Sequence, residues 1–120
     1  MTENYTVDPK DAEDNKVMAI LAYFGILFLV PLLVAKTSPF ARFHTNQGIL
    51  LCIAGVAVGI VLNILVVIFA AISGLFVMLT GLLSIIFGLG IFVLMVLGII
   101  NAAKGEMKEL PLIGKYRILN

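Results

Sequence analysis

From Phe43 through Ala103 the sequence contains no Lys, Arg, Asp or Glu. A helix of that length in water would carry a charged face, and this stretch carries none. The whole chain is 62% hydrophobic and 12% charged, whereas soluble domains are roughly half apolar. The excess of apolar residues needs an apolar solvent, so we expect an all-α integral membrane protein.

Charge and cysteine content exclude several other classes. The net charge is +1, so no strongly basic face is available and no nucleic-acid partner is expected. The single cysteine, Cys52, cannot form an internal disulfide. The first sixteen residues carry more acidic than basic side chains, whereas a cleavable signal peptide begins with a basic region. The first apolar segment is therefore expected to remain in the protein.

Three stretches are long and apolar enough to cross a bilayer, at about residues 17–35, 48–72 and 75–100. A transmembrane helix needs about 20 apolar residues, so the sequence predicts three transmembrane helices. Pro31 is expected to kink the first of them. Ser73 and Gly74 are the only break between the last two, which predicts a tight hairpin.

Polar segments flank this membrane domain, which is predicted to cover residues 17–103. Residues 1–16 form an acidic polar tail with a helix start at Asp8-Pro9. Residues 104–120 form an interfacial tail. Two amphipathic interfacial segments are predicted, one before the second span with Phe40 and Phe43, and one at the C-terminus around Leu110–Arg117.

The distribution of cations gives an expected orientation. With three spans, one side of the membrane would hold only Lys10 and Lys16. The other would hold Lys36, Arg42, Lys104, Lys108, Lys115 and Arg117. Because cytoplasmic segments are enriched in Lys and Arg, we expect a multi-pass cell-membrane protein with its C-terminus in the cytoplasm and its N-terminus outside.

Small residues recur on one face of each of the last two predicted helices. The second span carries Gly55, Gly59 and Asn63, and the third carries Gly81, Ser84 and Gly88. Folding the chain about Gly74 places these two stripes at the same depth. Small residues let membrane helices approach closely, so the stripes predict a helix-packing face. The alternative is that glycine is simply common in membrane helices.

Asn63 is the one strongly polar side chain well inside the apolar region. It could serve as a ligand for a substrate or an ion. The alternative, which we favour, is a hydrogen bond to Ser84 or Thr80 that joins two helices.

A polar group is also predicted where the second span begins and the third ends. Its residues are Arg42, His44, Asn46, Gln47, Asn101 and Lys104. His44 could be a pH sensor, but as the only histidine it is not expected to bind a metal within one chain. The favoured interpretation is an interfacial cluster of hydrogen bonds that holds the spans together.

Catalysis requires a nucleophile with a base, paired carboxylates or a metal. The hydroxyls of Ser73, Thr80 and Ser84 have no base at their depth, and no carboxylate lies within a predicted span. We therefore expect no enzyme activity, no catalytic residues and no cofactor.

Two segments resemble motifs of a known family. Lys36–Gly48 contains the pattern SPF-x-R-x-H-x-x-Q. The end of the chain, with Ile100–Glu106 and Leu110–Gly114, is similar to NA-x-x-GE followed by PL-IG. Together they resemble small bacterial and archaeal membrane proteins related to the chloroplast inner-envelope import component of twenty kilodaltons. That group includes magnetosome membrane proteins, and the plastid members imply a role in translocation.

The residues favour a non-catalytic membrane scaffold or accessory subunit that acts through helix packing. Its expected partners are the lipid bilayer, including anionic lipid, and further copies of itself or a larger membrane complex. The resemblance implies an alternative, a subunit of a protein-translocation or transport pore. A third alternative is an immunity-type membrane protein.

Overall fold

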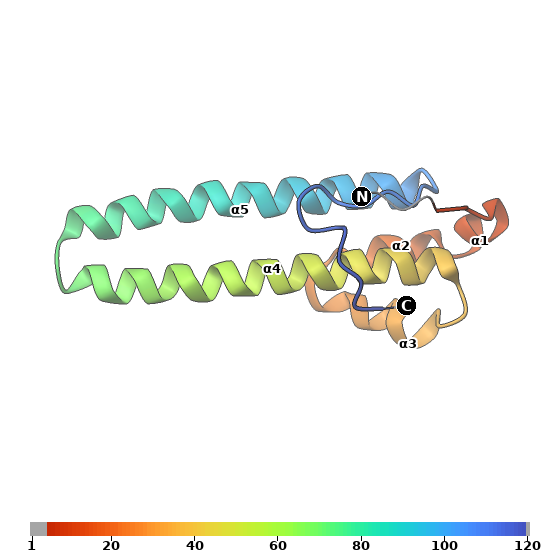
Figure 1. Cartoon of the computed structure of the whole chain (residues 1–120), viewed down its shortest axis with the longest axis horizontal. Helices are drawn as coiled ribbons and strands as arrows, with labels where there is room; N and C mark the ends of the chain where they lie inside the picture. Colours follow the sequence, from red (N-terminus) through yellow and green to blue (C-terminus); the bar gives the residue numbers. More distant parts are fainter. Residues whose placement is uncertain (1–4, 120) are drawn as a thin grey trace.

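The computed structural model describes residues 5–119. Every regular element in that range is helical (Figure 1). In chain order these are α1 (Pro9–Asp14), α2 (Lys16–Leu21), the 3-10 helix η1 (Gly25–Phe28), α3 (Leu29–Val34), α4 (Pro39–Ala70) and α5 (Gly74–Ala103). The first four residues of the predicted N-terminal tail, and the last residue of the C-terminal tail, lie outside the described range.

The long antiparallel pair α4 and α5 dominates the molecule, whose longest dimension is 57 Å. The two helices contain 32 and 30 residues. Within residues 5–119 they are the two helices that are long and apolar enough to cross a membrane. Ser73 caps the start of α5, and its hydroxyl accepts a hydrogen bond from the Leu75 amide at 3.1 Å. The predicted hairpin at Ser73-Gly74 is therefore confirmed.

The first predicted span is not a single helix. Residues 16–34, here called the fold-back segment, form α2, η1 and α3, which lie beside the beginning of α4 (Figure 1). The chain reverses near Gly25, whose φ of 57° lies in the left-handed region that glycine tolerates best. The prediction of a transmembrane helix over residues 17–35 is corrected here: three spans are not shown, because this segment turns back on itself.

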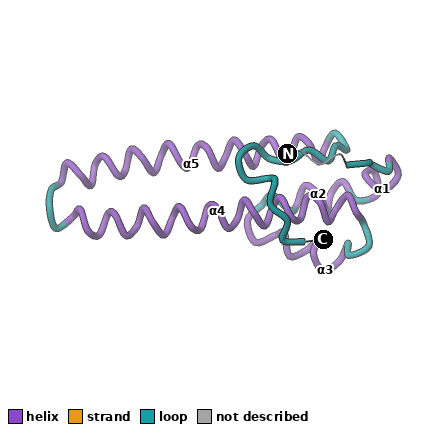
Figure 2. The backbone as a smooth tube through the Cα atoms, viewed as in Figure 1, coloured by secondary structure: helices purple, strands orange, loops and turns teal. Residues whose placement is uncertain are grey.

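The first and last described parts of the chain lie together in the half of the molecule away from the Ser73-Gly74 turn (Figure 2). The hydroxyl of Tyr5 donates a hydrogen bond to Oε2 of Glu109 at 3.3 Å. The rings of Tyr5 and Phe43 also pack edge to face, with centroids 4.6 Å apart. The expected placement of the two termini on opposite sides of the membrane is therefore wrong, because segments in contact cannot be separated by a bilayer.

The interfacial segment predicted before the second span is the first part of α4 itself. Ser38 caps this helix, accepting a hydrogen bond from the Ala41 amide at 3.0 Å, and Pro39 is its first residue. Phe40 and Phe43 are only 1% and 6% exposed. The prediction that they face the membrane interface is wrong, because the fold-back segment, residues 104–119 and the N-terminal tail cover this part of α4.

Within residues 5–119 the protein core lies at this end of the molecule. Its buried apolar residues come from five segments and include Ala12, Ala19, Tyr23, Phe40, Leu51, Ala102 and Leu110. Two glycines allow the fold-back segment to approach: a side chain at Gly48 would meet the Ala22 carbonyl, and one at Gly98 would meet the Tyr23 ring. Toward the Ser73-Gly74 turn, α4 and α5 expose their apolar side chains.

Candidate functional site

Four consecutive polar residues near the start of α4 are almost completely buried. His44, Thr45, Asn46 and Gln47 each have 0–1% of their surface exposed. Consecutive residues of a helix point in different directions, so their joint burial requires neighbours on several sides. The fold-back segment lies on one side of α4, and residues 104–119, here called the C-terminal segment, cross another.

His44 connects the fold-back segment to the beginning of the C-terminal segment. Its Nε2 lies 2.8 Å from the carbonyl oxygen of Glu106, and its Nδ1 lies 2.6 Å from the hydroxyl of Tyr23. A carbonyl oxygen can only accept, so Nε2 carries the proton and donates it. Nδ1 then accepts the hydrogen bond from the Tyr23 hydroxyl. The imidazole is neutral in this arrangement and both of its nitrogens are used.

Gln47 holds the C-terminal segment at two points. Its Oε1 accepts a hydrogen bond from the Leu110 amide, and its Nε2 donates to the Gly114 carbonyl, both at 2.9 Å. A side chain at Gly114 would meet both Leu110 and Gln47, so glycine is required for this close approach. Between the two points lies Leu112, with a φ of 72° and 89% of its surface exposed.

Asn46 binds the last described residues in the same way. Its Nδ2 donates to the Tyr116 carbonyl at 2.9 Å. Its Oδ1 accepts from the amides of Ile118, at 2.7 Å, and Leu119, at 3.0 Å. Backbone amides and carbonyls need hydrogen-bond partners, which a helix or water usually supplies. In the C-terminal segment the side chains of Asn46 and Gln47 supply several of them.

Asp11 ties α1 to the start of α4. Its Oδ1 accepts a hydrogen bond from the Ser38 hydroxyl at 2.6 Å, and its Oδ2 accepts from the Phe40 amide at 3.0 Å. A carboxylate is favoured at this position because the first amides of a helix lack partners and carry partial positive charge.

Ion pairs add to the contacts of the C-terminal segment. Arg117 Nη2 is 2.6 Å from Oε2 of Glu109, and both side chains are mostly buried. Lys108 Nζ is 2.9 Å from Oε2 of Glu106, in a more exposed position. The hydrogen bond from the Lys108 ammonium lowers the pKa of the Glu106 carboxyl group below its ordinary value.

The structure brings together part of the predicted polar cluster. His44, Asn46 and Gln47 share one network, which links α4 to the C-terminal segment. Arg42 lines a cavity beside that network. Asn101 accepts a hydrogen bond through its backbone carbonyl from the Glu106 amide. Lys104 lies exposed at the end of α5, outside the network.

The glycine stripes line one hollow of about 240 Å³ between α4 and α5. Gly55, Gly59, Ser84 and Gly88 all contribute to it. The predicted close approach is not seen at Gly59, Gly81 and Gly88, where an added Cβ would meet no atom within 4 Å.

The helices are instead separated by larger side chains. Val58, Leu62 and Phe87 line both this hollow and a second one on the opposite flank of the pair. They therefore form the wall between the two hollows. Their bulk explains why the backbones remain apart at the glycines.

The polar residues of the hairpin bind their own helices. Asn63 Nδ2 lies 3.5 Å from the carbonyl oxygen of Gly59. The hydroxyls of Ser84 and Thr80 donate to the carbonyls of Thr80 and Phe76, each at 2.9 Å. These bonds differ from the predicted bond between Asn63 and Ser84, and they follow the common pattern in which a polar side chain bonds a carbonyl four residues earlier.

Sequence reasoning missed two residues of the network, Tyr23 and Asp11. Tyr23 is the only tyrosine of its apolar segment, and a buried phenol requires a hydrogen-bond partner. A tyrosine in an apolar segment could therefore have indicated a buried hydrogen bond at this position. The role of Asp11 at α4 had no local signal, because Ser38 and Phe40 are far from it in the sequence.

The side chains of this network hold neighbouring segments of the chain in place through hydrogen bonds. Asn46 and Gln47 bind backbone groups of the C-terminal segment, and His44 binds one backbone carbonyl and one phenol. Among residues 5–119, no three His, Cys, Asp or Glu side chains are grouped so that they could hold a metal ion. The arrangement fixes the fold-back segment, α4 and the C-terminal segment against one another.

Comparison with known proteins places this chain among small membrane proteins. Residues 14–118 match the model of the magnetosome magnetite crystal formation protein family. The chain is 30% identical, over 94% of both chains, to magnetosome protein MamF of Magnetospirillum gryphiswaldense. It is 36% identical to magnetosome protein MmsF of Paramagnetospirillum magneticum, over 81% of this chain and 79% of that protein. No solved structure matches the chain.

Proposed function

This chain belongs to the magnetosome magnetite crystal formation protein family, and we propose that it acts in the magnetosome membrane as a non-catalytic scaffold that assembles with copies of itself. The family is involved in magnetite crystal formation. This protein would contribute with two parts. The hydrogen-bonded end of the molecule would hold its segments in one arrangement, and the α4–α5 hairpin would pack against other protomers in the membrane.

The observation that carries the proposal is the use of the polar residues at the start of α4. His44, Asn46 and Gln47 are buried, and their hydrogen bonds hold the C-terminal segment. Polar side chains engaged in this way stabilise one arrangement of the chain. They favour a structural role for the family motif that contains them over a role in binding a substrate.

The outer half of the α4–α5 hairpin supports assembly. Its apolar side chains are exposed, and in the hollow lined by Gly55, Gly59 and Gly88 these three glycines leave the backbone uncovered beside larger side chains such as Phe87. Lipid does not drive apolar helices together, so close packing at small residues is the usual source of association. A helix of a second protomer could approach the backbone closely along this hollow.

Gly59→Leu tests this proposal, because a Cβ added at Gly59 meets no atom of its own protomer within 4 Å. The protomer should therefore fold normally. Val61→Leu is the matched control, since Val61 lines the hollow on the opposite flank. Particle mass would be measured in lipid nanodiscs, together with the yield of lipid-phase crosslinking. We expect Gly59→Leu to reduce the oligomeric fraction at least several-fold and Val61→Leu to leave it unchanged. A monomeric wild-type protein, or equal effects of both changes, would contradict the proposal.

The resemblance to the chloroplast import component favours a different function, a translocation pore. A pore needs a polar lumen, and the hairpin offers Asn63, Thr80 and Ser84. Each of these side chains bonds a carbonyl of its own helix. We therefore rank the pore second to the scaffold.

The proposed orientation follows from the cations of the whole chain. Every Lys and Arg residue lies outside the stretch from Phe43 to Ala103, and Arg42 lies directly before it. With two spans these cations belong to one side of the membrane, and the Ser73-Gly74 turn carries none. The enrichment of Lys and Arg in cytoplasmic segments therefore favours a cytoplasmic position for both termini.

A further inference from the structure

The fold-back segment is apolar on the side that faces away from the protein. Lys16 is its first residue, Lys36 lies just beyond its end, and the stretch between them contains no charged residue. Because the chain reverses near Gly25, both lysines lie toward the same side of the membrane. An extended apolar surface marks contact with a partner or with lipid. The exposed large side chains of the segment are Val17, Phe24, Ile26, Leu27, Leu29, Leu33 and Val34.

A second exposed apolar point lies in the C-terminal segment. Residues 110–114, here called the Leu112 loop, are bound at both ends by the side chain of Gln47. Leu112 lies between these two points and is almost fully exposed. The loop is therefore held in one position with an apolar side chain pointing away from the protein.

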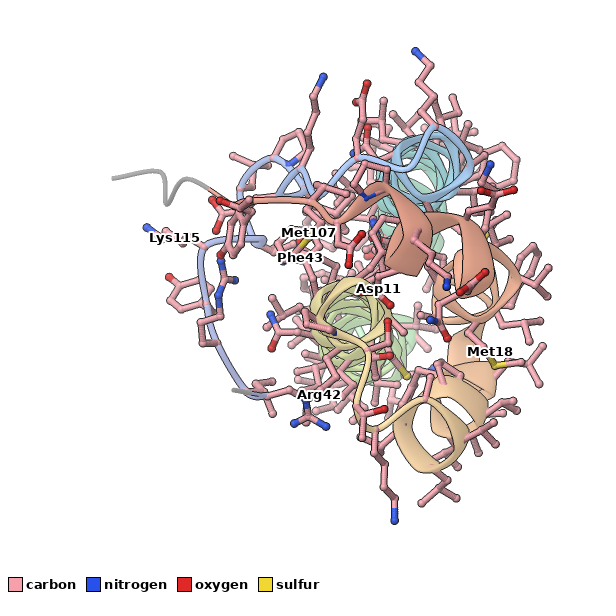
Figure 3. All side chains as sticks on the ribbon, turned by 90° about the vertical axis from the view of Figure 1, so that its right-hand side faces the viewer. Asp11, Met18, Arg42, Phe43, Met107 and Lys115 are labelled. Atoms are coloured by element: carbon pink, nitrogen blue, oxygen red, sulfur yellow. The ribbon has the colours of Figure 1, made fainter. Side chains whose placement is uncertain are left out.

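The fold-back segment and the Leu112 loop meet α4 at consecutive residues. Gln47 binds the loop, and a Cβ added at Gly48 would meet the Ala22 carbonyl of the fold-back segment. Consecutive positions of a helix lie at nearly the same depth but point in directions about 100° apart. The two segments therefore flank α4 at one level. Figure 3 shows this arrangement along the helix axes, with Met18 on one side of α4 and Lys115 on the other.

This level corresponds to one boundary of the hydrocarbon layer. Ala70, the last residue of α4, follows Gln47 by 23 positions, or roughly 35 Å at ~1.5 Å per residue. The hydrocarbon layer is about 30 Å thick. With the Ser73-Gly74 turn just beyond the layer on the far side, Gln47 lies at the near boundary. The fold-back segment and the Leu112 loop therefore enter the headgroup region and the outer hydrocarbon of one leaflet.

The two halves of the molecule differ in width as a result. Near Gln47 the fold-back segment and the Leu112 loop accompany α4 and α5. Toward the Ser73-Gly74 turn, α4 and α5 are the only parts of residues 5–119 that continue, and their apolar side chains are exposed (Figure 1). The protein therefore displaces more lipid in one leaflet than in the other.

We propose that the protein is a membrane wedge that prefers curved bilayers in which the leaflet holding the fold-back segment is convex. Convex bending spreads the headgroups of a leaflet and exposes hydrocarbon between them. Apolar segments at this depth fill the gaps, and membrane binding by interfacial amphipathic helices is curvature-sensitive for this reason. The wedge goes beyond the scaffold function, because it depends on the two-span arrangement and not on self-assembly.

The test measures how the full-length protein distributes between a giant vesicle and a narrow membrane tube pulled outward from it. The outer leaflet of the tube is convex. Phosphatidylcholine alone would form the membrane, so that lipid charge plays no part. A lipid dye reports the membrane area. The measured quantity is the amount of protein per unit area on the tube relative to the vesicle.

Labelling from outside selects the orientation. In a Cys52→Ala background, a membrane-impermeant dye on Thr6→Cys marks molecules whose fold-back segment lies in the convex leaflet of the tube. The same dye on Ile72→Cys marks molecules in the opposite orientation. We expect the first population to be enriched on the tube at least roughly twofold and the second to be depleted. Equal densities on tube and vesicle, or enrichment of both populations, would overturn the proposal.

Two double variants assign the effect to the fold-back segment. Ile26→Ala with Leu33→Ala removes exposed side-chain volume from that segment, and Ile64→Ala with Leu79→Ala removes the same groups near the hairpin turn. All four side chains are exposed, so both variants should fold. The first should lower the enrichment of the Thr6→Cys population, and the second should not. Equal losses in both would contradict the proposal. Gly59→Leu should distribute like the unaltered chain, so the wedge and the scaffold can fail separately.

Discussion

The hydroxyl of Tyr23 lies 2.6 Å from Nδ1 of His44, and this contact is buried on all sides. It joins the turn of the fold-back segment to the family motif at the start of α4. Because the opposite nitrogen of His44 binds the Glu106 carbonyl, one imidazole connects three segments that are far apart in the sequence. The position of the fold-back segment depends on this bond and on the glycine at position 98, against which the Tyr23 ring lies.

Tyr23→Phe should destabilise the protein by about 1–3 kcal/mol, because it leaves the buried Nδ1 of His44 without a donor. The measurement is thermal unfolding in detergent, followed by circular dichroism. Tyr116→Phe is the control, since Tyr116 is 56% exposed. Equal unfolding temperatures for the two variants would show that the hydrogen bond contributes nothing.

Gln47→Leu should release the C-terminal segment. The change removes both hydrogen bonds to Leu110 and Gly114 while keeping an apolar side chain of similar size. Amide hydrogen exchange over residues 104–119 should become at least tenfold faster, which corresponds to about 1.4 kcal/mol or more of lost protection. Asn63→Leu should leave that exchange unchanged, because Asn63 is exposed and bonds only its own helix. Unaltered exchange in Gln47→Leu would refute the assignment.

Gly98→Ala should be far more damaging than Gly90→Ala. An added Cβ at Gly98 would overlap the Tyr23 ring, whereas at Gly90 it would meet no atom within 4 Å. Overpacking of this kind costs about 1–3 kcal/mol. The loss would be measured as the fraction of folded protein at increasing denaturant in mixed micelles. If both substitutions have the same small effect, the close contact between α5 and the fold-back segment is incorrect.

The two termini should label from the same side of the membrane. In a background with Cys52→Ala, the substitutions Thr6→Cys and Ile118→Cys place thiols near the two ends, and Ile72→Cys places one beside the hairpin turn. A membrane-impermeant reagent applied to right-side-out vesicles should reach only the position 72 thiol. Labelling of positions 6 and 118 from opposite sides would restore an odd number of spans.

The sequence predicts those parts of the fold that depend on residues close together in the chain. The α4–α5 hairpin follows from a charge-free stretch with one break at Ser73-Gly74, and the structure confirms it. The helix caps at Asp8 and Ser38 also form as their residue types predict. His44, Asn46 and Gln47 were predicted to form hydrogen bonds that hold segments together, but their partners, Tyr23 and the backbone of the C-terminal segment, were not predicted.

The fold-back segment could not be predicted from its hydrophobicity. Residues 17–35 satisfy the length and composition of a span, and Gly25 alone does not require a reversal. The reversal of the chain depends on tertiary contacts. Gly48 and Gly98 leave room for Ala22 and Tyr23, and His44 forms a hydrogen bond with Tyr23. The membership of Asn101 and Lys104 in the cluster was overestimated for a similar reason, since depth along a helix does not fix the direction of a side chain.

The composition of the α4–α5 hairpin has a consequence for how the protein is inserted. Translocation of a charged side chain through the centre of a bilayer costs about 2.5–3.5 kcal/mol on insertion scales. The hairpin contains no such side chain between Phe43 and Ala103, so both helices can enter together and carry only a short uncharged turn to the far side. In the opposite orientation, every charged side chain of the chain would have to cross the bilayer. Insertion of the hairpin is therefore energetically favoured in one orientation only.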